Sequence, residues 1–275
     1  MTTDAEPTFD YIRELGVPEL PPAIVPFDPG YDVGTVTGHL EQSHRFMAGL
    51  KLSMATWMIA DPNSTRQKIA AARSFGVATV AGGGPFEVAA ACGTLDRYLD
   101  LCASMGITRI EAASGFTQAR PDPAGTLAQA RDRGLEVQFE LGRKHDGPLD
   151  AGSLDDVLDE GRAWLDAGAS DVVVEARESA RNVGIFDADG NLQAELADRI
   201  GSQLGLERVV FEAPDKRSQF SLLDHFGPHV QLGNVRLEEI LRVEIYRRGL
   251  HSDSFSDPRL APGRAPHAAK STEQR

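Results

Sequence analysis

Short apolar runs alternate with amphipathic, helix-like stretches along almost the whole 275-residue chain. Eight of the runs have the β-branched and apolar character of strands: 23–27, 50–54, 78–81, 109–112, 136–140, 171–175, 208–212 and 230–232. The stretches between and after them predict helices at about 33–47, 63–75, 86–105, 122–133, 153–167, 192–204, 215–226 and 236–249. Strand starts are spaced by about 20 to 37 residues, the length of a βα unit. The pattern therefore predicts eight successive βα units.

Two folds accommodate this alternation, a closed (β/α)8 barrel and an open doubly wound sheet. The count of eight and the total length favour the barrel. The segment after the first predicted strand reads FDPGYDVG, and it lacks the G-x-G-x-x-G pattern of a dinucleotide-binding fold. We predict an α/β protein with a single-domain (β/α)8 TIM barrel over 21–256. Residues 1–20 are expected to form a loose arm or a plug over the barrel floor, and 257–275 a disordered tail.

Composition narrows the class of protein. The chain is 41% hydrophobic, which suffices for a core, and it carries 28 Lys and Arg against 41 Asp and Glu, a formal net charge of −13. An acidic surface argues against nucleic acid and anionic membranes as partners. There is no apolar run of membrane-spanning length and no signal-peptide start. Cys92 and Cys102 are expected to be reduced core thiols. We predict a cytoplasmic protein, and the sequence leaves homo-oligomer formation open.

Candidate chemistry gathers at the carboxyl ends of the predicted strands, where barrel enzymes place their active sites. Four successive strands bring a glutamate to this rim: Glu111, Glu140, Glu175 and Glu212. Like charges in one pocket repel unless cations compensate them. Basic residues lie at matching depth: Lys51, Arg143, Lys144, Arg177 and Lys216. Carboxylate oxygens suit Mg²⁺, and the basic groups suit a small anionic substrate that carries phosphate or carboxylate.

Each of these features also has a purely structural interpretation. Glu–Lys and Glu–Arg pairs inside barrels can merely satisfy one another. Asn234 can bind a ligand or cap the following helix. The glycines at 82–84 can hold an anion at a helix start or simply form a tight turn. The polar segment 177–187 is long for a βα connection, which is typical of a lid or a binding loop.

Several motifs nevertheless resemble the phosphosulfolactate synthase family over residues 23–255. They are AGGGPFEVA (81–89), FELGRK (139–144), VVVEARES (172–179), NVGIFD (182–187), FEAPDKRSQ (211–219) and RRGLHSDSF (247–255). The resemblance implies a (β/α)8 barrel that uses Mg²⁺ to add sulfite to phosphoenolpyruvate on a route to coenzyme M. The family also includes plant heat-stress proteins, so a non-catalytic or repurposed barrel is the alternative function.

The resemblance also implies roles for individual residues. Glu140, Glu175 and Glu212 would hold the metal. Lys144, Lys51 and Arg177 would be catalytic, with Lys144 delivering a proton to the substrate. Substrate-binding residues would be Lys216, Arg143, Glu178, Asn234 and Gly83.

Two segments depart from the family motifs. The motif K-F-G-W-G-T-S stands as KLSMATW (51–57), and S-D-G-[ST] stands as ASGF (113–116). Both segments follow predicted strands at the rim, where a substrate would bind. We therefore expect this chain to share the barrel framework with the family more closely than the exact substrate.

Overall fold

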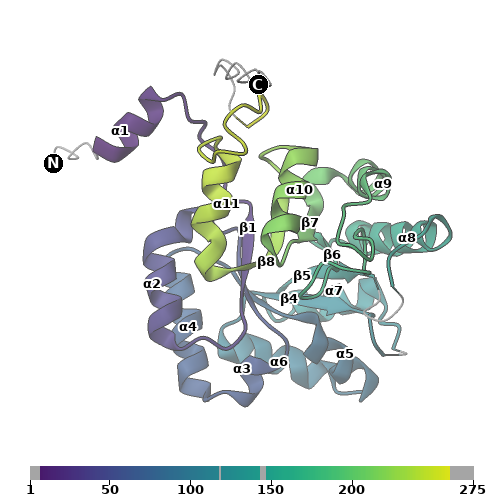
Figure 1. Ribbon diagram of the computed structural model, residues 1–275. Coiled ribbons are helices and arrows are strands. Elements are labelled where there is room, and N and C mark those ends of the chain that lie inside the picture. The colour runs from purple at the N-terminus through teal and green to yellow at the C-terminus, as the bar shows by residue number, and fades with distance from the viewer. Residues whose placement is uncertain (1–6, 118, 143–146, 261–275) are drawn as a thin grey trace, which may run out of the picture.

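A computed structural model describes residues 7–117, 119–142 and 147–260 of the chain (Figure 1). Eight parallel strands close into one barrel in sequence order, and β8 pairs with β1. The strands are β1 (Ile24–Asp28), β2 (Leu50–Leu52), β3 (Thr79–Ala81), β4 (Arg109–Ala113), β5 (Glu136–Leu141), β6 (Val172–Val174), β7 (Val209–Glu212) and β8 (Gln231–Arg236). The predicted (β/α)8 architecture is confirmed.

Helices surround the barrel in Figure 1. They are α2 (Val33–Ser43), α3 (Thr56–Ile59), α4 (Pro62–Ser74), α5 (Gly83–Ala91), α6 (Leu95–Met105), α7 (Pro123–Arg131), α8 (Ala151–Ala167), α9 (Ala194–Leu204), α10 (Lys216–Phe226) and α11 (Ile240–Arg247), with 3-10 turns at His44–Phe46, Leu206–Arg208 and Leu237–Glu239. Five helices begin after an aspartate whose side chain accepts a backbone N–H of the first turn, namely Asp32, Asp61, Asp122, Asp150 and Asp215. This capping explains why those helices start where they do.

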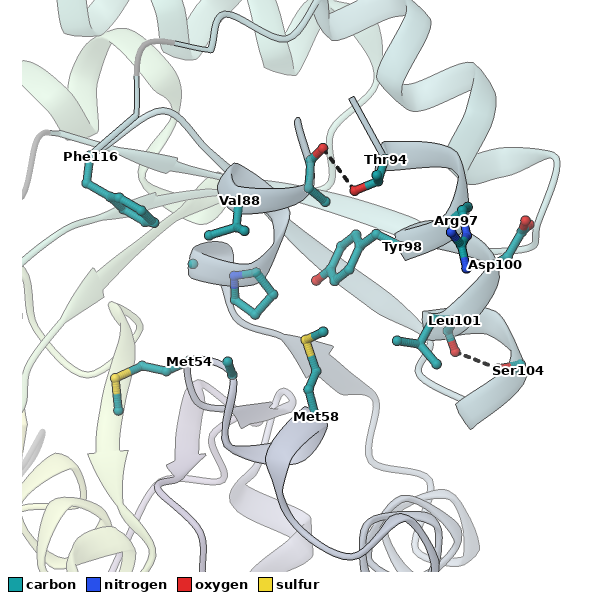
Figure 2. Close-up of a pocket in the computed structure, with 14 residues that line it drawn as sticks. Met54, Met58, Val88, Thr94, Arg97, Tyr98, Asp100, Leu101, Ser104 and Phe116 are labelled. Atoms are coloured by element: carbon teal, nitrogen blue, oxygen red, sulfur yellow. Dashed lines mark hydrogen bonds between the residues drawn. The ribbon is translucent and has the colours of Figure 1, made fainter. Parts of the chain in front are cut away.

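The rim after β2 and β3 differs from the prediction. The single helix expected over 86–105 is two helices, α5 and α6, because Gly93 adopts a left-handed φ of +66° and breaks the run. The strand predicted over 50–54 ends at Leu52, and Met54 has a φ of +52° before the short helix α3. Residues of α3, α5 and α6 together line one cleft at this part of the barrel (Figure 2).

The barrel interior changes from apolar to charged along the strands. Val25, Val173 and Val210 pack together in a small inner cluster. Because side chains alternate along a strand, residues two positions further on face inward as well. In β7 this places Glu212 beyond Val210, and Glu175 likewise follows Val173 at the end of β6. The charged layer therefore lies at the carboxyl ends of the strands.

The two ends of the chain require corrections. The predicted loose arm or plug contains a helix, α1 (Pro7–Glu14), that extends away from the barrel in Figure 1 and does not cover its floor. The Arg45 guanidinium lies 4.2 Å from the ring centroid of Phe9 in this helix. The predicted disordered tail starts too early at residue 257, since Leu260 is fully buried. Residues 261–275 lie outside the described residues.

The prediction for the two cysteines holds for one of them. Cys102 is buried, and burial raises the pKa of its thiol to about 12. Cys92 is exposed at the end of α5, so it is not a core thiol. Over the described part of the chain, the helices are too short or too polar to cross a membrane.

Candidate active site

A cavity of about 440 Å³ opens at the carboxyl ends of the barrel strands. Five glutamates and three basic residues line it among the described residues: Glu111, Glu140, Glu175, Glu178 and Glu212, with Lys51, Arg177 and Arg236. The predicted rim glutamates thus converge on one cavity. Glycines 82–84, Ser53, Ser179 and Asn234 supply further polar surface.

Lys51 occupies the centre of the charged layer. Its Nζ lies 2.8 Å from Glu111 Oε1, 3.1 Å from Glu212 Oε1 and 3.8 Å from Glu140 Oε2. Burial alone would lower the pKa of this ammonium, but the three glutamates raise the pKa well above its ordinary value. Lys51 is therefore a fixed positive charge that offsets part of the carboxylate charge.

Glu111 fixes the segment between β3 and α5. The N–H of Gly83 donates to its Oε1 at 3.0 Å, and the amide of Gln138 donates to its Oε2 at 2.8 Å. A Cβ at Gly83 would lie 2.8 Å from Ala113 Cβ, so this close approach requires glycine. Burial raises the pKa of Glu111 although Lys51 opposes the shift. Glu111 thus has a structural role in the site, because its hydrogen bond keeps Gly83 in position at the cavity wall.

Glu175 and Glu212 shape the entry to the segment after β6. Val174 is in register with Phe211, so the next residues, Glu175 and Glu212, are level at the rim. The N–H of Ala176 donates to Glu212 Oε2 at 2.9 Å, and the N–H of Arg177 donates to Glu175 Oε1 at 2.5 Å. These bonds hold Arg177 at a left-handed φ of +57°, where its side chain lines the cavity beside Glu178.

The end of β8 supplies two residues of the cavity: Asn234, which was predicted to bind substrate, and Arg236, which was not predicted. Asn234 lines the cavity, and its buried Oδ1 accepts no hydrogen bond from any described residue. It does not cap a helix, because Arg236 and Glu239 hold the N-cap positions that follow. Arg236 lines the cavity with its guanidinium 5.8 Å from the Phe27 ring centroid. Asn234 has a left-handed φ of +52° and is the extra residue where the pairing of β8 with β1 shifts register, so regular alternation along the sequence does not place Arg236.

One predicted substrate-binding residue lies away from the cavity, and two predicted site residues fall in a segment that the structure does not describe. Lys216 is exposed at the start of α10, with its Nζ 5.1 Å from the Phe220 ring centroid, and it does not line the cavity. Arg143 and Lys144 lie outside the described residues. Ser114, in the altered segment after β4, does not line the cavity either. Its Oγ donates to Glu160 Oε1 at 3.0 Å.

The donor chemistry suits Mg²⁺ in part. Within the described ranges, no three acidic, His or Cys side chains come together as a metal cage. Mg²⁺ commonly needs only one or two protein carboxylates and completes its shell with water and substrate oxygens. Both carboxylate oxygens of Glu212 already accept bonds, from Lys51 and from Ala176. Glu140 and Glu175 line the same cavity, and Glu175 Oε1 accepts the N–H of Arg177.

Solved structures share the fold of this chain. The carboxyl transferase domain of Rhizobium etli pyruvate carboxylase aligns with a TM-score of 0.57 at 11% identity, over 84% of this chain and 41% of that one. KGPDC from Streptococcus mutans aligns with a TM-score of 0.51 at 13% identity, over 82% and 99%. At such identities the likeness concerns the barrel alone.

Sequence relatives are more specific. The phosphosulfolactate synthase of Methanothermobacter thermautotrophicus is 30% identical over 255 residues, 92% of this chain and 99% of that protein. The phosphosulfolactate synthase of Methanocaldococcus jannaschii is 29% identical over 232 residues, 84% and 92% of the two chains. The family model for (2R)-phospho-3-sulfolactate synthase matches residues 24–253. The resemblance noted in the motifs is thereby confirmed, and the chain belongs to this family of lyase-type enzymes.

Proposed function

We propose that this protein adds sulfite, or a similar nucleophile, to phosphoenolpyruvate in a Mg²⁺-dependent reaction, which with sulfite forms phosphosulfolactate. The observation that carries the proposal is the cavity at the strand ends, in which Lys51 lies among three glutamates and which Arg177 and Arg236 also line. The family membership supports the same reaction type.

The positions of the basic groups suggest which part of the cavity would bind the phosphate and which the carboxylate of the substrate. Arg177 after β6 and Arg236 in β8 lie on the same side of the barrel, and their guanidinium groups suit a phosphate. Asn234 on that side can donate its amide N–H to a ligand oxygen. The substrate carboxylate would then lie toward Lys51 and the glutamates.

In the proposed reaction the nucleophile forms a bond to the methylene carbon of phosphoenolpyruvate. The π electron pair moves toward the carboxylate, and a proton is then delivered to the carbon that bears the phosphate. Lys51 is a poor proton donor near neutral pH because its pKa is raised. It stabilises the growing negative charge instead. Lys144, which lies two residues beyond Gly142 but outside the described residues, remains our candidate for the proton donor.

The charge of the cavity supports the binding of a metal ion. Five glutamates outnumber the three basic residues that line it, so an anionic substrate alone would meet excess negative charge. We propose that carboxylates among Glu140, Glu175 and Glu212 hold Mg²⁺. When bound, the ion would supply further charge stabilisation at the substrate carboxylate.

The alternative is a non-catalytic barrel of the same family. Such a barrel would be favoured if the glutamates paired off with basic residues and closed the site. The cavity is instead open, and Glu140, Glu175 and Arg177 all line it. This observation supports the enzyme.

The test is to incubate the purified protein with phosphoenolpyruvate, sulfite and Mg²⁺ and to look for phosphosulfolactate by mass spectrometry. Chelation of the metal should abolish the product. Arg236→Gln should lower kcat/KM by about 10- to 100-fold, through loss of a charged hydrogen bond. Arg217→Gln is the control, because Arg217 bonds Asp189 and Asn191 outside the cavity. Unchanged turnover in Lys144→Ala would exclude that lysine as the proton donor.

A further inference from the structure

A second pocket, of about 700 Å³, lies between α1, α11, the segment 17–20 and the 3-10 turn His44–Phe46. The segment 17–20 precedes β1 and the turn precedes β2, so the pocket is at the amino ends of the strands, opposite the charged cavity. Figure 1 shows α1 and the chain after α11 at the same end of the molecule. The volume is typical of small-molecule sites. The charged residues that line the pocket are three arginines and two glutamates: Arg13, Arg45, Arg248, Glu19 and Glu244.

Arg248 carries positive charge that the protein compensates only in part. Its side chain is 15% exposed, and its Nη1 lies 3.0 Å from Glu244 Oε2. This buried nitrogen nevertheless has no well-aligned hydrogen bond to any described residue. Glu244 also pairs with Arg247, so two arginines share one carboxylate. Burial lowers the pKa of Arg248, and the charges of Arg247 and Arg45 act in the same direction, although Glu244 opposes them.

Arg45 brings a second guanidinium to the same place. The guanidinium carbons of Arg45 and Arg248 lie 4.9 and 5.2 Å from the ring centroid of Phe46. Within the described part of the chain Arg45 has cation–π contacts but no ion pair, and the exposed Glu19 pairs with neither arginine. Arg13 already has an ion-pair partner within α1. Arg45 and Arg248 therefore form the part of the pocket that attracts an anion.

The remaining wall of the pocket is apolar. Phe9 and Ile12 of α1 line it together with Leu241 and Ile245 of α11. Leu241 and Ile245 retain 37% and 43% of their accessible surface, and exposed apolar surface of this kind indicates a binding site. No residue of α1 is buried, and an isolated helix of eight residues is not stable in water. A ligand between α1 and α11 would hold α1 in place.

We propose that this pocket binds a small organic anion, with its carboxylate or phosphate on Arg45 and Arg248 and its apolar part between α1 and α11. Guanidinium groups form paired hydrogen bonds with both kinds of anion. Arg248 Nη1 supplies a donor that lacks a partner in the described chain. An anion between the two arginines also offsets their mutual repulsion, which a neutral or cationic ligand does not. The proposal is independent of the reaction in the charged cavity.

Calorimetric titration of the full-length protein with phenyl phosphate and with 3-phenylpropionate tests the pocket. Each should bind about tenfold more tightly than inorganic phosphate or acetate, which lack the apolar part. Arg248→Gln should weaken binding of the phenyl probes by about 10- to 100-fold, and Arg248→Lys, which keeps the charge, should weaken it less. Arg236→Gln is the control, because Arg236 lines the charged cavity and not this pocket.

A second variant tests the apolar wall. Ile245→Asn should weaken binding of the phenyl probes by about fivefold and leave inorganic phosphate and acetate unaffected. Ile59→Asn is its matched control, since Ile59 is 86% exposed on α3 and does not line the pocket. Hydrogen exchange locates the site, because a bound probe should slow exchange in α1. Exchange in the barrel strands reports whether each variant is folded.

The outcomes separate this pocket from the charged cavity and from a protein partner. Binding that is lost in Arg236→Gln but kept in Arg248→Gln would overturn the proposal, as would probes that bind without slowing exchange in α1. Slow exchange in α1 that appears with rising protein concentration, without a probe and together with a larger sedimenting species, would assign the pocket to a second copy and overturn it too. Binding of only one phenyl probe would support the proposal and identify the anionic group.

Discussion

At the scale of single residues, the site depends on Lys51 as its internal cation. Three buried glutamates lie within 4 Å of its Nζ. Lys51→Met leaves them without that charge, and breaking a buried ion pair in this way costs about 3–5 kcal/mol. We expect urea unfolding at neutral pH to show a loss of this size. Lys216→Met is the control, because the exposed Lys216 contacts one aromatic ring and should cost about 1 kcal/mol or less. Equal losses in both variants would contradict the central role of Lys51.

The buried Glu111 should make the stability of the protein depend on pH. Burial raises its folded-state pKa above the ordinary value of 4.5. Its contribution to stability is therefore present below that value and is lost as pH rises through the folded-state pKa. The free energy of unfolding of the wild type relative to Glu111→Gln should fall as pH rises from about 4.5. Denaturant titrations at several pH values measure this difference. A difference that rises with pH would show that Lys51 outweighs burial at this carboxylate.

At the scale of elements, the sequence predicted strands and their ends better than the segments between them. The glutamates are recognisable because each ends or follows a β-branched run, and strand ends in a barrel share one rim. Lys216 has the right distance from Glu212 along the chain, but α10 begins at Lys216, and its side chain lies over Phe220. The break between α5 and α6 depends on the backbone of Gly93, which the apolar pattern does not reveal. Arg236 was missed because the strand predicted over 230–232 continues to that residue.

The segment after β6 requires glycine at position 184. Gly184 has a φ of +55°, and a Cβ there would lie 2.2 Å from the Glu175 carbonyl oxygen. Gly184→Ala must therefore displace backbone at the end of β6, at a cost of about 2–4 kcal/mol. Since Arg177 is held next to Glu175, turnover should fall together with stability in thermal unfolding and activity assays.

A matched control separates the clash from the cost of the backbone conformation. Gly76 follows α4 with a φ of +72°, and a Cβ there would meet no atom within 4 Å. The N–H of Val77 donates to the Ala72 carbonyl oxygen, as in a left-handed helix cap. Gly76→Ala should thus cost only about 1 kcal/mol and leave turnover unchanged. If the two alanine variants were equally stable, the close contact at Glu175 would not matter.

At the scale of the whole molecule, the net charge of −13 and the cavity act over different distances. An anionic substrate is repelled by the acidic surface at long range and attracted by Arg177 and Arg236 only near the cavity. Added salt shortens the Debye length from about 30 Å at 0.01 M to about 8 Å at 0.15 M. Salt therefore screens the long-range repulsion more than the short-range attraction.

This separation predicts an unusual salt dependence for an enzyme with an anionic substrate. At saturating Mg²⁺, kcat/KM for phosphoenolpyruvate should rise by about two- to threefold over that salt range. Steady-state kinetics in potassium chloride measure the slope. In Arg236→Gln the local attraction is weaker, so the relative rise should be at least as large. A fall in kcat/KM with salt would mean that the arginines of the cavity dominate the field that the substrate meets, despite the acidic surface around them.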